Sequence, residues 1–401
     1  MQAHDTEYCD FRELTATVVT WNAGAATPSN LRYDERDSNF FREVLGIDNP
    51  PDLLVFGFQE LVDLEDKKLT AKSLFKGNKK KDAEHEQMHM SRQYRAWRDH
   101  LVMSIENNMP SDRPYDLLHT ASMVGLFSCV FVKANIRNNI NNLSAAEVKR
   151  GMGGLHGNKG CLALRFLIDD SSLCFINCHL AAGQTQTLHR NNDISAILES
   201  VLFVPERHPN ARCDSYSGGG DGSMILDHEI CILNGDLNYR IDTMSRDTVV
   251  KAVQAQNLKK LLERDQLLVS RRRNPGFRLR AFTESPITFA PTYKYDVGTD
   301  RYDTSEKRRA PAWCDRILYR GAGKIKQLDY RRHELMVSDH RPVSAAFKMR
   351  IKTVLQEKRP AAWHACLERL EAVKVEMARN AKIIYLRDVL GVDLEEAKSL
   401  V

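Results

Sequence analysis

Short apolar runs recur along the chain, and most of them are rich in β-branched residues. Each run has the length of a strand buried on both faces. The runs lie at 15–22, 52–60, 125–134, 160–168, 172–180, 229–238, 313–320 and 342–349. Helical periodicity appears between some of them, at 39–46, at 189–203 and most clearly at 245–268, where Ser245 supplies an N-cap. Strands separated by helices predict a layered α/β fold, and strands that follow one another directly predict mixed or antiparallel sheets.

The pattern changes from Ile351 onward, where strand-like runs stop. Leu367, Leu370, Val373 and Met377 stand at helical spacing. The segment therefore predicts two or three helices after a break at Pro360. We expect a main domain over 15–350 and a helical extension or linker over 351–401.

The composition of the chain favours an intracellular protein. The net charge of +5 is mild and fits an anionic partner without demanding one. The nine cysteines are dispersed and form no CxxC pair, which favours a reducing compartment. The chain begins without a basic, apolar leader, and no apolar run approaches the roughly 20 residues that span a bilayer. We expect a cytoplasmic protein.

A lysine-rich run at 67–81 holds seven lysines and no acid. A solvated surface loop is its simplest interpretation. The alternative is contact with an anionic membrane, worth about 1 kcal/mol for each basic residue near the surface.

Polar residues follow several of the apolar runs directly. The clearest case is "EICILNGDLNYRID", in which a buried run ends at Asp236 and Asn238. Burying a carboxylate costs several kcal/mol unless it is paired, so the simple alternative is an Asn-Gly-Asp turn. Similar polar residues border the other runs: Asn22, Glu60 and His179 end three of them, Asp315 stands at the start of another, and Asp339 with His340 comes just before the last. One such residue is a cap or a turn, but the whole set predicts strand ends that converge on one cleft.

The chemistry of this set favours a hard cation. The chain contains no HExxH, GxSxG or GxxxxGK[ST] motif, so zinc proteolysis, a nucleophile elbow and a P-loop are not supported. Carboxylates and amides with few histidines suit Mg²⁺, held together with water and substrate phosphate. Metal-assisted hydrolysis of a phosphoester is the reaction class that fits best.

The chain also resembles a known family. The segments "WNAG", "FGFQEL", "GLHGNKG", "NCHLAAG", "LNGDLNYRI", "PTYKYD", "PAWCDRIL" and "SDHRPV" stand in the order typical of inositol polyphosphate 5-phosphatases. The resemblance covers 15–348 and implies the deoxyribonuclease I-like fold of the endonuclease/exonuclease/phosphatase superfamily. That fold is a four-layer α/β/β/α sandwich of two mixed β-sheets flanked by helices. The later part of "TWNAGAATPSNL" departs from the commonest family form, and the helical extension resembles a linker of larger, multidomain members.

The resemblance implies a role for each polar residue at the strand ends. Glu60 would bind Mg²⁺ with Asn22 beside it. Asp236 would position and activate the attacking water, which Asn238 would help to orient. His340 would act at the phosphate with Asp315 as its carboxylate partner. His179 would be a second histidine at the phosphate, and Asp339 an accessory metal or water ligand.

Substrate selection would fall to basic residues. By resemblance, the neighbouring 4-phosphate is read by Tyr293, Lys294, Lys307 and Arg309. Asn158 and Lys159 would contact phosphate on the 1-phosphate side. Lys and Arg form charge-assisted hydrogen bonds with phosphate, although 307–309 taken alone is a plain basic loop.

The resemblance predicts Mg²⁺-dependent removal of the 5-phosphate from phosphoinositides such as phosphatidylinositol 4,5-bisphosphate and 3,4,5-trisphosphate, and from soluble inositol polyphosphates. A peripheral location at the cytosolic face of membranes would follow, with no nucleic acid expected as a partner. Two alternatives are a nuclease of the same superfamily and a catalytically silent phosphoinositide-binding module. The segment 121–132 is expected to be a core strand, and its alternative is an apolar lip that enters the bilayer.

Overall fold

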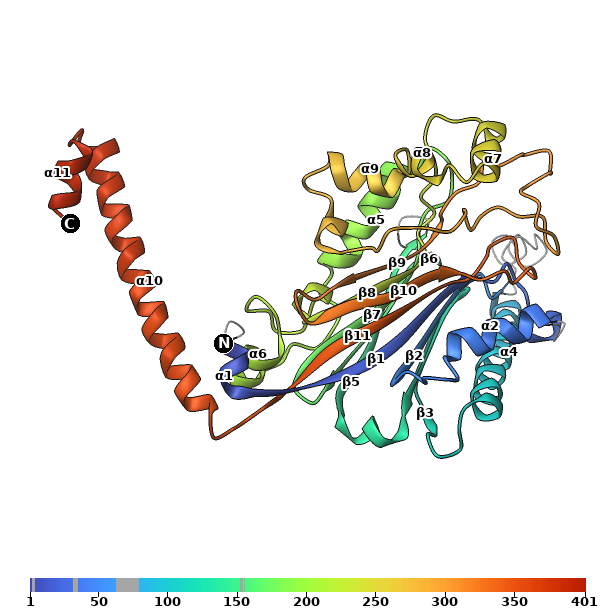
Figure 1. Ribbon diagram of the computed structural model, residues 1–401, viewed down its shortest axis with the longest axis horizontal. Helices are drawn as coiled ribbons and strands as arrows, with labels where there is room; N and C mark the ends of the chain where they lie inside the picture. The colour runs from blue at the N-terminus through green and yellow to red at the C-terminus, as the bar shows by residue number, and fades with distance from the viewer. Residues whose placement is uncertain (2–3, 32–34, 63–78, 152–153, 155) are drawn as a thin grey trace. The chain divides into compact units, whose positions relative to one another are not determined.

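The computed structural model describes residues 1–401 except 2–3, 32–34, 63–78, 152–153 and 155 (Figure 1). Its chain divides into two compact units, one formed by Arg12–Ile351 and the other by Met1–Phe11 with Lys352–Val401. The lysine-rich run lies outside the described residues up to 78, and 79–81 begin a helix.

The larger unit is built on two β-sheets. One sheet has six strands in the order β10-β11-β1-β2-β4-β3. Their bounds are β10 Ile325–Arg332, β11 Val343–Val354, β1 Cys9–Asn22, β2 Leu53–Gln59, β4 Leu126–Lys133 and β3 Tyr115–Met123. The other has five strands in the order β5-β6-β7-β8-β9. Their bounds are β5 Ile140–Gly151, β6 His156–Ile168, β7 Ser171–His179, β8 Ile230–Asp236 and β9 Asp315–Arg320.

Both sheets are mixed, as the sequence predicts. β1 pairs with β2 in parallel, and β7 pairs with β8 in parallel. The pairs β2–β4, β3–β4, β5–β6, β6–β7, β8–β9 and β10–β11 are antiparallel. Each parallel pair therefore brings the carboxyl ends of two strands to the same edge of its sheet.

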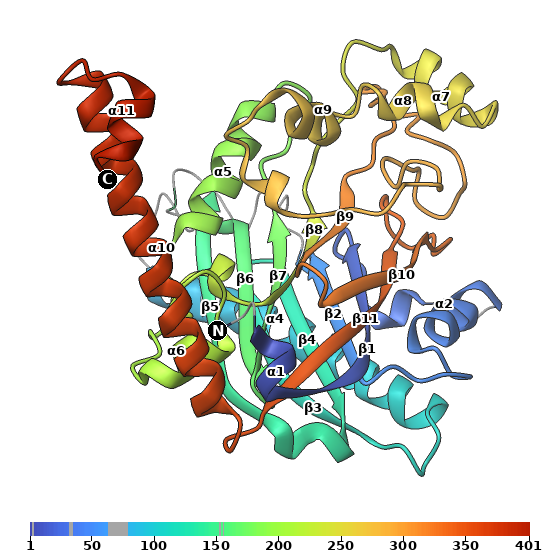
Figure 2. The ribbon, with the colours of Figure 1, turned by 60° about the vertical axis from the view of Figure 1, so that its left-hand side comes forward.

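Helices cover the outer faces of the two sheets (Figures 1 and 2). The α-helices of this unit are α2 Glu35–Leu45, α4 Lys79–Asn108, α5 Thr187–Glu199, α6 Pro209–Ser215, α7 Arg246–Gln254, α8 Leu258–Leu262 and α9 Gln266–Arg273. Single 3₁₀ turns lie at η2 Pro28–Asn30, η3 Ala134–Asn139, η5 Ile225–Asp227 and η6 Arg278–Ala281.

Three apolar clusters hold these four layers together. Because successive side chains of a strand point to opposite faces, a strand that is apolar throughout supplies two layers at once. The cluster between the sheets contains Val18, Val55, Val130, Phe166, Phe175 and Ile232. The cluster under α2 and α4 contains Val19, Phe56, Phe131, Phe41 and Trp97. The cluster under α5 and α9 contains Ile176, Leu233, Ile194, Ile197 and Leu267. The arrangement is the predicted α/β/β/α sandwich.

The strands that the apolar pattern does not reveal are β3, β5 and β10. All three are sheet edges, and each carries partly exposed or exposed polar residues along most of its length. An edge strand with one solvent-exposed face alternates polar and apolar residues, so it shows no continuous apolar run. β1 and β11 also extend beyond their predicted ends, so that β11 continues four residues into the segment expected to lack strands.

The single helix expected over 245–268 is wrong, because this segment forms the three short helices α7, α8 and α9. Ser245 is the N-cap of α7, as predicted, and its side chain accepts a hydrogen bond from the Thr248 amide. The chain leaves the helix at Gln256, whose φ is +55°. Asp265 then caps α9 by accepting from the Leu268 amide.

The Asn-Gly-Asp segment is strand and not turn, because its three residues pair with β7 on one side and β9 on the other as the end of the buried strand β8. Gly235 is required there, since a Cβ built on it would lie 2.0 Å from the Cys178 carbonyl oxygen of β7.

The segment 121–132 belongs to the core, as expected, but it forms the end of the first strand, the turn and the second strand of the β3–β4 hairpin and not a single strand. Met123, Leu126 and Phe127 are buried, so these three side chains form no exposed apolar lip.

The smaller unit contains α1 Asp5–Tyr8, α10 Arg359–Asp388 and α11 Leu394–Ser399. Pro360 lies in the first turn of α10, where its missing N–H costs no hydrogen bond. The apolar positions predicted at helical spacing lie on α10 and are exposed. Among the described helices none is long and apolar enough to cross a membrane. All nine cysteines are free thiols.

Candidate active site

The predicted polar residues meet where the carboxyl ends of the two parallel strand pairs face each other. Asn22 of β1 stands beside Gln59 of β2, and Glu60 follows at once. His179 of β7 stands opposite Asp236 of β8. Asp315 opens the antiparallel neighbour β9 and pairs with Asp236. The sheet registers thus gather residues that lie far apart in the sequence.

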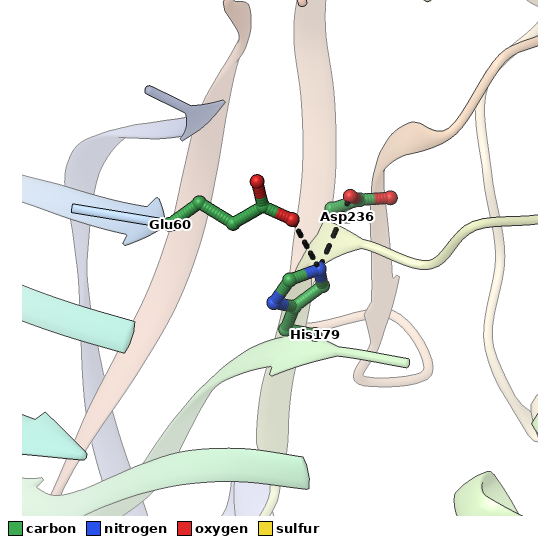
Figure 3. Close-up of side chains that lie close together, drawn as sticks. All are labelled: Glu60, His179 and Asp236. Atoms are coloured by element: carbon green, nitrogen blue, oxygen red, sulfur yellow. Dashed lines mark ion pairs between the residues drawn. The ribbon is translucent and has the colours of Figure 1, made fainter. Parts of the chain in front are cut away.

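Glu60, His179 and Asp236 form one cluster (Figure 3). His179 Nε2 lies 3.4 Å from Glu60 Oε1 and 3.4 Å from Asp236 Oδ2. One ligand atom from each of the three residues lies within 4.8 Å of the others, a spacing that suits a metal ion. The Lys159 ammonium also contacts His179 Nε2. His179 and Asp236 are buried, whereas the Glu60 side chain is 43% exposed, so the cluster opens on the Glu60 side.

Asp236 is held as a carboxylate by its neighbours. The Asn22 amide nitrogen donates to Asp236 Oδ2 at 2.9 Å, and the Asn238 backbone N–H donates to Oδ1 at 3.0 Å. Burial would raise the pKa of Asp236, but the hydrogen bond from His179 and the positive charges of His340, His179 and Lys159 outweigh it. The pKa of Asp236 is therefore held far below its usual range, and the group stays ionised.

His340 and Asp315 form a buried pair beside Asp236. His340 Nδ1 lies 2.9 Å from Asp315 Oδ2, which also accepts from the Thr292 hydroxyl at 2.7 Å. The other ring nitrogen, Nε2, lies 4.0 Å from Asp236 Oδ2. Burial alone would lower the pKa of His340, but the carboxylates of Asp315, Asp236 and Asp339 raise it to about 9. His340 is thus an imidazolium at neutral pH, with Nε2 directed toward the centre of the site.

Two site residues occupy the left-handed region of backbone conformation. Glu60 has φ +51° and Asn238 has φ +57°. Such angles are uncommon for residues other than glycine and persist where the surroundings fix them. The Asn238 side chain donates to the Leu180 carbonyl and accepts from the Arg240 guanidinium at 2.5 Å. Glu60 thus enters the cluster through its side chain, whereas Asn238 contacts it through the backbone N–H that donates to Asp236.

A basic cavity of about 780 Å³ adjoins this cluster. Its lining includes the predicted Tyr293, Lys307 and Arg309 together with Arg240. The Tyr293 ring connects the cavity to the reacting centre, because its centroid lies 4.5 Å from the His340 ring and 4.3 Å from the Arg240 guanidinium carbon. The volume is that of a pocket for a whole small ligand.

The remaining predicted residues lie at the edges of the site. The Lys294 ammonium donates to Asp339 Oδ2 at 2.7 Å and does not line the cavity. Burial opposes this charge on Lys294, but the bond to Asp339 outweighs it and raises the pKa of the ammonium. Asn158 precedes Lys159 in β6 and is half-buried. Successive strand residues point to opposite faces, so these two side chains cannot share one face.

Comparison with known proteins shows the family to which this chain belongs. The model of Endonuclease/Exonuclease/phosphatase family 2 matches residues 19–346. The Arabidopsis thaliana protein "Type I inositol polyphosphate 5-phosphatase 8" is 34% identical over 382 residues, which are 89% of this chain and 75% of that protein. The chain belongs to the inositol polyphosphate 5-phosphatase family.

Two further matches have a higher and a lower sequence identity to this chain than the Arabidopsis protein has. The Schizosaccharomyces pombe protein "Probable inositol polyphosphate 5-phosphatase C9G1.10c" is 45% identical over 399 residues, or 99% of this chain. The chain spans about a third of that relative's length, 33%. The crystal structure of the inositol polyphosphate 5-phosphatase domain of SPsynaptojanin, in complex with inositol (1,4)-bisphosphate and calcium ion, aligns with a TM-score of 0.70 and 29% identity, covering 95% of this chain and 96% of that one.

The fold alone is shared more widely than the family. The structure of a Cimex nitrophorin ferrous NO complex aligns with a TM-score of 0.54 at 21% identity. Such a likeness concerns the fold only, and function has to be argued from the site. In this member of the 5-phosphatase family, the strand-end cluster and the basic cavity provide that argument.

Sequence reasoning missed several residues of the site. Arg240 bridges Asn238 and Tyr293, and its only signal is its place two residues after Asn238 in "LNYRI". Thr292 fixes the Asp315 carboxylate from within "PTYKYD". Arg246 and Arg308 also line the cavity. No local pattern distinguishes these basic residues from a solvated basic loop.

Proposed function

We propose that this chain hydrolyses the 5-phosphate of phosphoinositides, such as phosphatidylinositol 4,5-bisphosphate and 3,4,5-trisphosphate, and of soluble inositol polyphosphates, with Mg²⁺ as cofactor. The observation that carries the proposal is the direct neighbourhood of two features. One feature is the cluster of carboxylates and histidines, whose groups suit phosphoryl chemistry. The other is a basic cavity that is large enough for a polyphosphorylated ring. Tyr293 connects them, because it lines the cavity and lies against His340.

The donor set fits a hard divalent cation. Glu60 and Asp236 offer carboxylate oxygens, and His179 lies between them. Mg²⁺ is commonly held by one or two carboxylates, with water and substrate phosphate completing its shell. Asn22 fixes Asp236 through its amide nitrogen, while its oxygen accepts from the Gly24 N–H at 3.1 Å. When bound, the cation would neutralise charge on the phosphoryl oxygens.

The chain's own groups would handle the proton and the phosphate. Asp236 stays ionised and lies where a water could be oriented and deprotonated, and Asn238 shapes the same corner. His340, charged through Asp315, would donate from Nε2 to a phosphoryl oxygen as negative charge develops. His179, with Lys159 against it, would make a second contact to the phosphate. Asp339, paired with Lys294, would serve as an accessory water or metal ligand.

The cavity would read the phosphate next to the scissile one. Lys307 and Arg309 reach it from one loop, and the Tyr293 ring forms its wall. Charge-assisted hydrogen bonds from these cations would hold the 4-phosphate. Lys294 would contribute from the edge. Of the two residues expected at the 1-phosphate, Asn158 would make that contact, because Lys159 points to the other face of β6 and lies against His179. A peripheral position at the cytosolic face of membranes, with further domains of a larger protein as partners, would follow from a lipid substrate.

The two alternatives are less well supported. A nuclease needs an open groove along a polymer, whereas the cations here surround a cavity. A silent binding module has no need of an ionised Asp236 beside a charged His340.

The test is phosphate release from phosphatidylinositol 4,5-bisphosphate and from inositol 1,4,5-trisphosphate, each with Mg²⁺ and with EDTA. We expect Mg²⁺-dependent release with the 4-monophosphate lipid as product. Absence of release from both substrates would refute the proposal. Abasic DNA is the substrate that would then reveal a nuclease.

A further inference from the structure

The basic cavity continues beyond the residues assigned to the 4-phosphate. Arg246 of α7 and Arg308 line it together with Thr243 and Gln184. Within the described part of the chain, the lining residues include no carboxylate. The lining thus carries more positive charge than one additional phosphate requires, even after Asp247, which lies outside the lining, offsets one of its cations.

The four arginines of the cavity divide into two groups. Arg240 and Arg309 belong to the Tyr293 side: burial raises the pKa of Tyr293, and the charges of both arginines oppose that rise. Arg246 and Arg308 belong to the α7 side, because both donate to Asp247 Oδ1, at 3.0 Å and 2.9 Å. A shared carboxylate therefore holds these two guanidiniums next to each other.

Arg246 is firmly placed and Arg308 is free to adjust. Arg246 also donates to the carbonyl oxygens of Tyr302 and Asp303, at 2.8 Å and 3.0 Å, and its side chain is only 18% exposed. The Arg308 side chain is 59% exposed, and the backbone of Arg308 has a φ of +38°. A fixed guanidinium beside an adjustable one suits bidentate capture of a phosphate, because Arg presents donors in a planar fork.

The two groups can be matched to positions on the substrate ring. Tyr293 lies against His340, which marks the 5-phosphate, so Tyr293 with Arg309 marks the next position. The α7 side lines the same cavity as a separate pair of cations held by Asp247, and position 3 follows positions 5 and 4 around an inositol ring. Resting on the function proposed above, we propose that Arg308 and Arg246 bind a 3-phosphate, so that the enzyme favours 3,4,5-phosphorylated rings over 4,5-phosphorylated ones, whether the ring belongs to a lipid or to a soluble inositol phosphate.

The test compares kcat/KM for two matched pairs of substrates. The lipid pair is dioctanoyl phosphatidylinositol 3,4,5-trisphosphate and 4,5-bisphosphate. The soluble pair is inositol 1,3,4,5-tetrakisphosphate and 1,4,5-trisphosphate. The variant is Arg308→Asn, because Asn tolerates a left-handed backbone better than other non-glycine residues. The matched control is Arg301→Asn, which removes an equal charge from an exposed residue outside the cavity.

We expect the wild-type ratio within each pair to favour the 3-phosphorylated substrate. Arg308→Asn should lower that ratio about tenfold, the scale of one charge-assisted hydrogen bond, and Arg301→Asn should leave it unchanged. An unchanged ratio in Arg308→Asn, or an equal loss on all four substrates, would overturn the inference. A loss confined to both lipids would also overturn it, since it would indicate membrane contact. If wild-type protein releases phosphate from none of the four, the proposed function fails instead.

Discussion

Replacing Asp315 with asparagine isolates the charge that keeps His340 protonated. Asparagine has the shape of aspartate and can still accept from the Thr292 hydroxyl, so packing is preserved while the negative charge disappears. Three carboxylates together raise the pKa of His340 to about 9, with Asp315 contributing most. The shift from an ordinary value of about 6.5 corresponds to about 3 kcal/mol.

Without Asp315, Asp236 and Asp339 still raise the pKa of His340, but burial, the largest single influence, opposes them, so the pKa should fall toward the ordinary value. The imidazolium fraction at pH 7 should then fall from about 99% toward about 25%. Loss of a charged donor at a developing oxyanion costs about 10²–10³ in turnover, so Asp315→Asn should reduce kcat at pH 7 by about that factor. Its activity should recover partly as the pH is lowered.

The stability consequence has a defined sign. A folded-state pKa above the unfolded value adds stability that is complete below about pH 6.5 and is lost as the pH rises through about 9. The difference in unfolding free energy between wild type and Asp315→Asn should therefore be larger near pH 6.5, where Asp315 is ionised and His340 is charged, than near pH 9, and it should shrink across that window.

The assay combines histidine-ring NMR titration in EDTA with pH–rate profiles on inositol 1,4,5-trisphosphate. His340→Gln identifies the His340 resonance by its disappearance. A His340 ring that still titrates near pH 9 in Asp315→Asn, or an unchanged kcat at pH 7, would refute the reasoning.

Three further predictions follow from other groups. Asp236→Asn should lower kcat by several orders of magnitude with an unchanged circular dichroism spectrum, because the group acts on the reacting water; near-normal turnover would remove Asp236 from the mechanism. Lys294→Ala should mainly impair substrates that carry a 4-phosphate, and an equal loss on phosphatidylinositol 5-phosphate would contradict that role. Burial lowers the pKa of His228 to about 4, so the unfolded state binds more protons between about pH 4 and 6.5 and stability should fall by up to about 3 kcal/mol as the pH drops through that window. Urea unfolding across this range should show a slope that His228→Asn lacks.

The sequence by itself determined the parts of this protein that depend on local pattern. Continuous apolar runs identified the central strands, because a strand covered on both faces must be apolar throughout. The same runs ended in Asn22, Glu60, His179 and Asp236, and the cost of burying such groups indicated a shared site before any contact was known. The motif resemblance supplied the family and the role expected of each residue.

Only the tertiary structure decided features that depend on pairing between distant segments. The edge strands β3, β5 and β10 carry too few apolar residues to be recognised from the sequence pattern. Their positions are set by the strand with which each one pairs. The parallel registers of β1–β2 and β7–β8 bring Glu60 and Asp236 to one histidine. Arg240, Arg246 and Arg308 look like ordinary surface cations in the sequence. Their meaning comes from a cavity that loops far apart in the chain enclose together, because electrostatic effects depend on distance in space and not on separation along the chain.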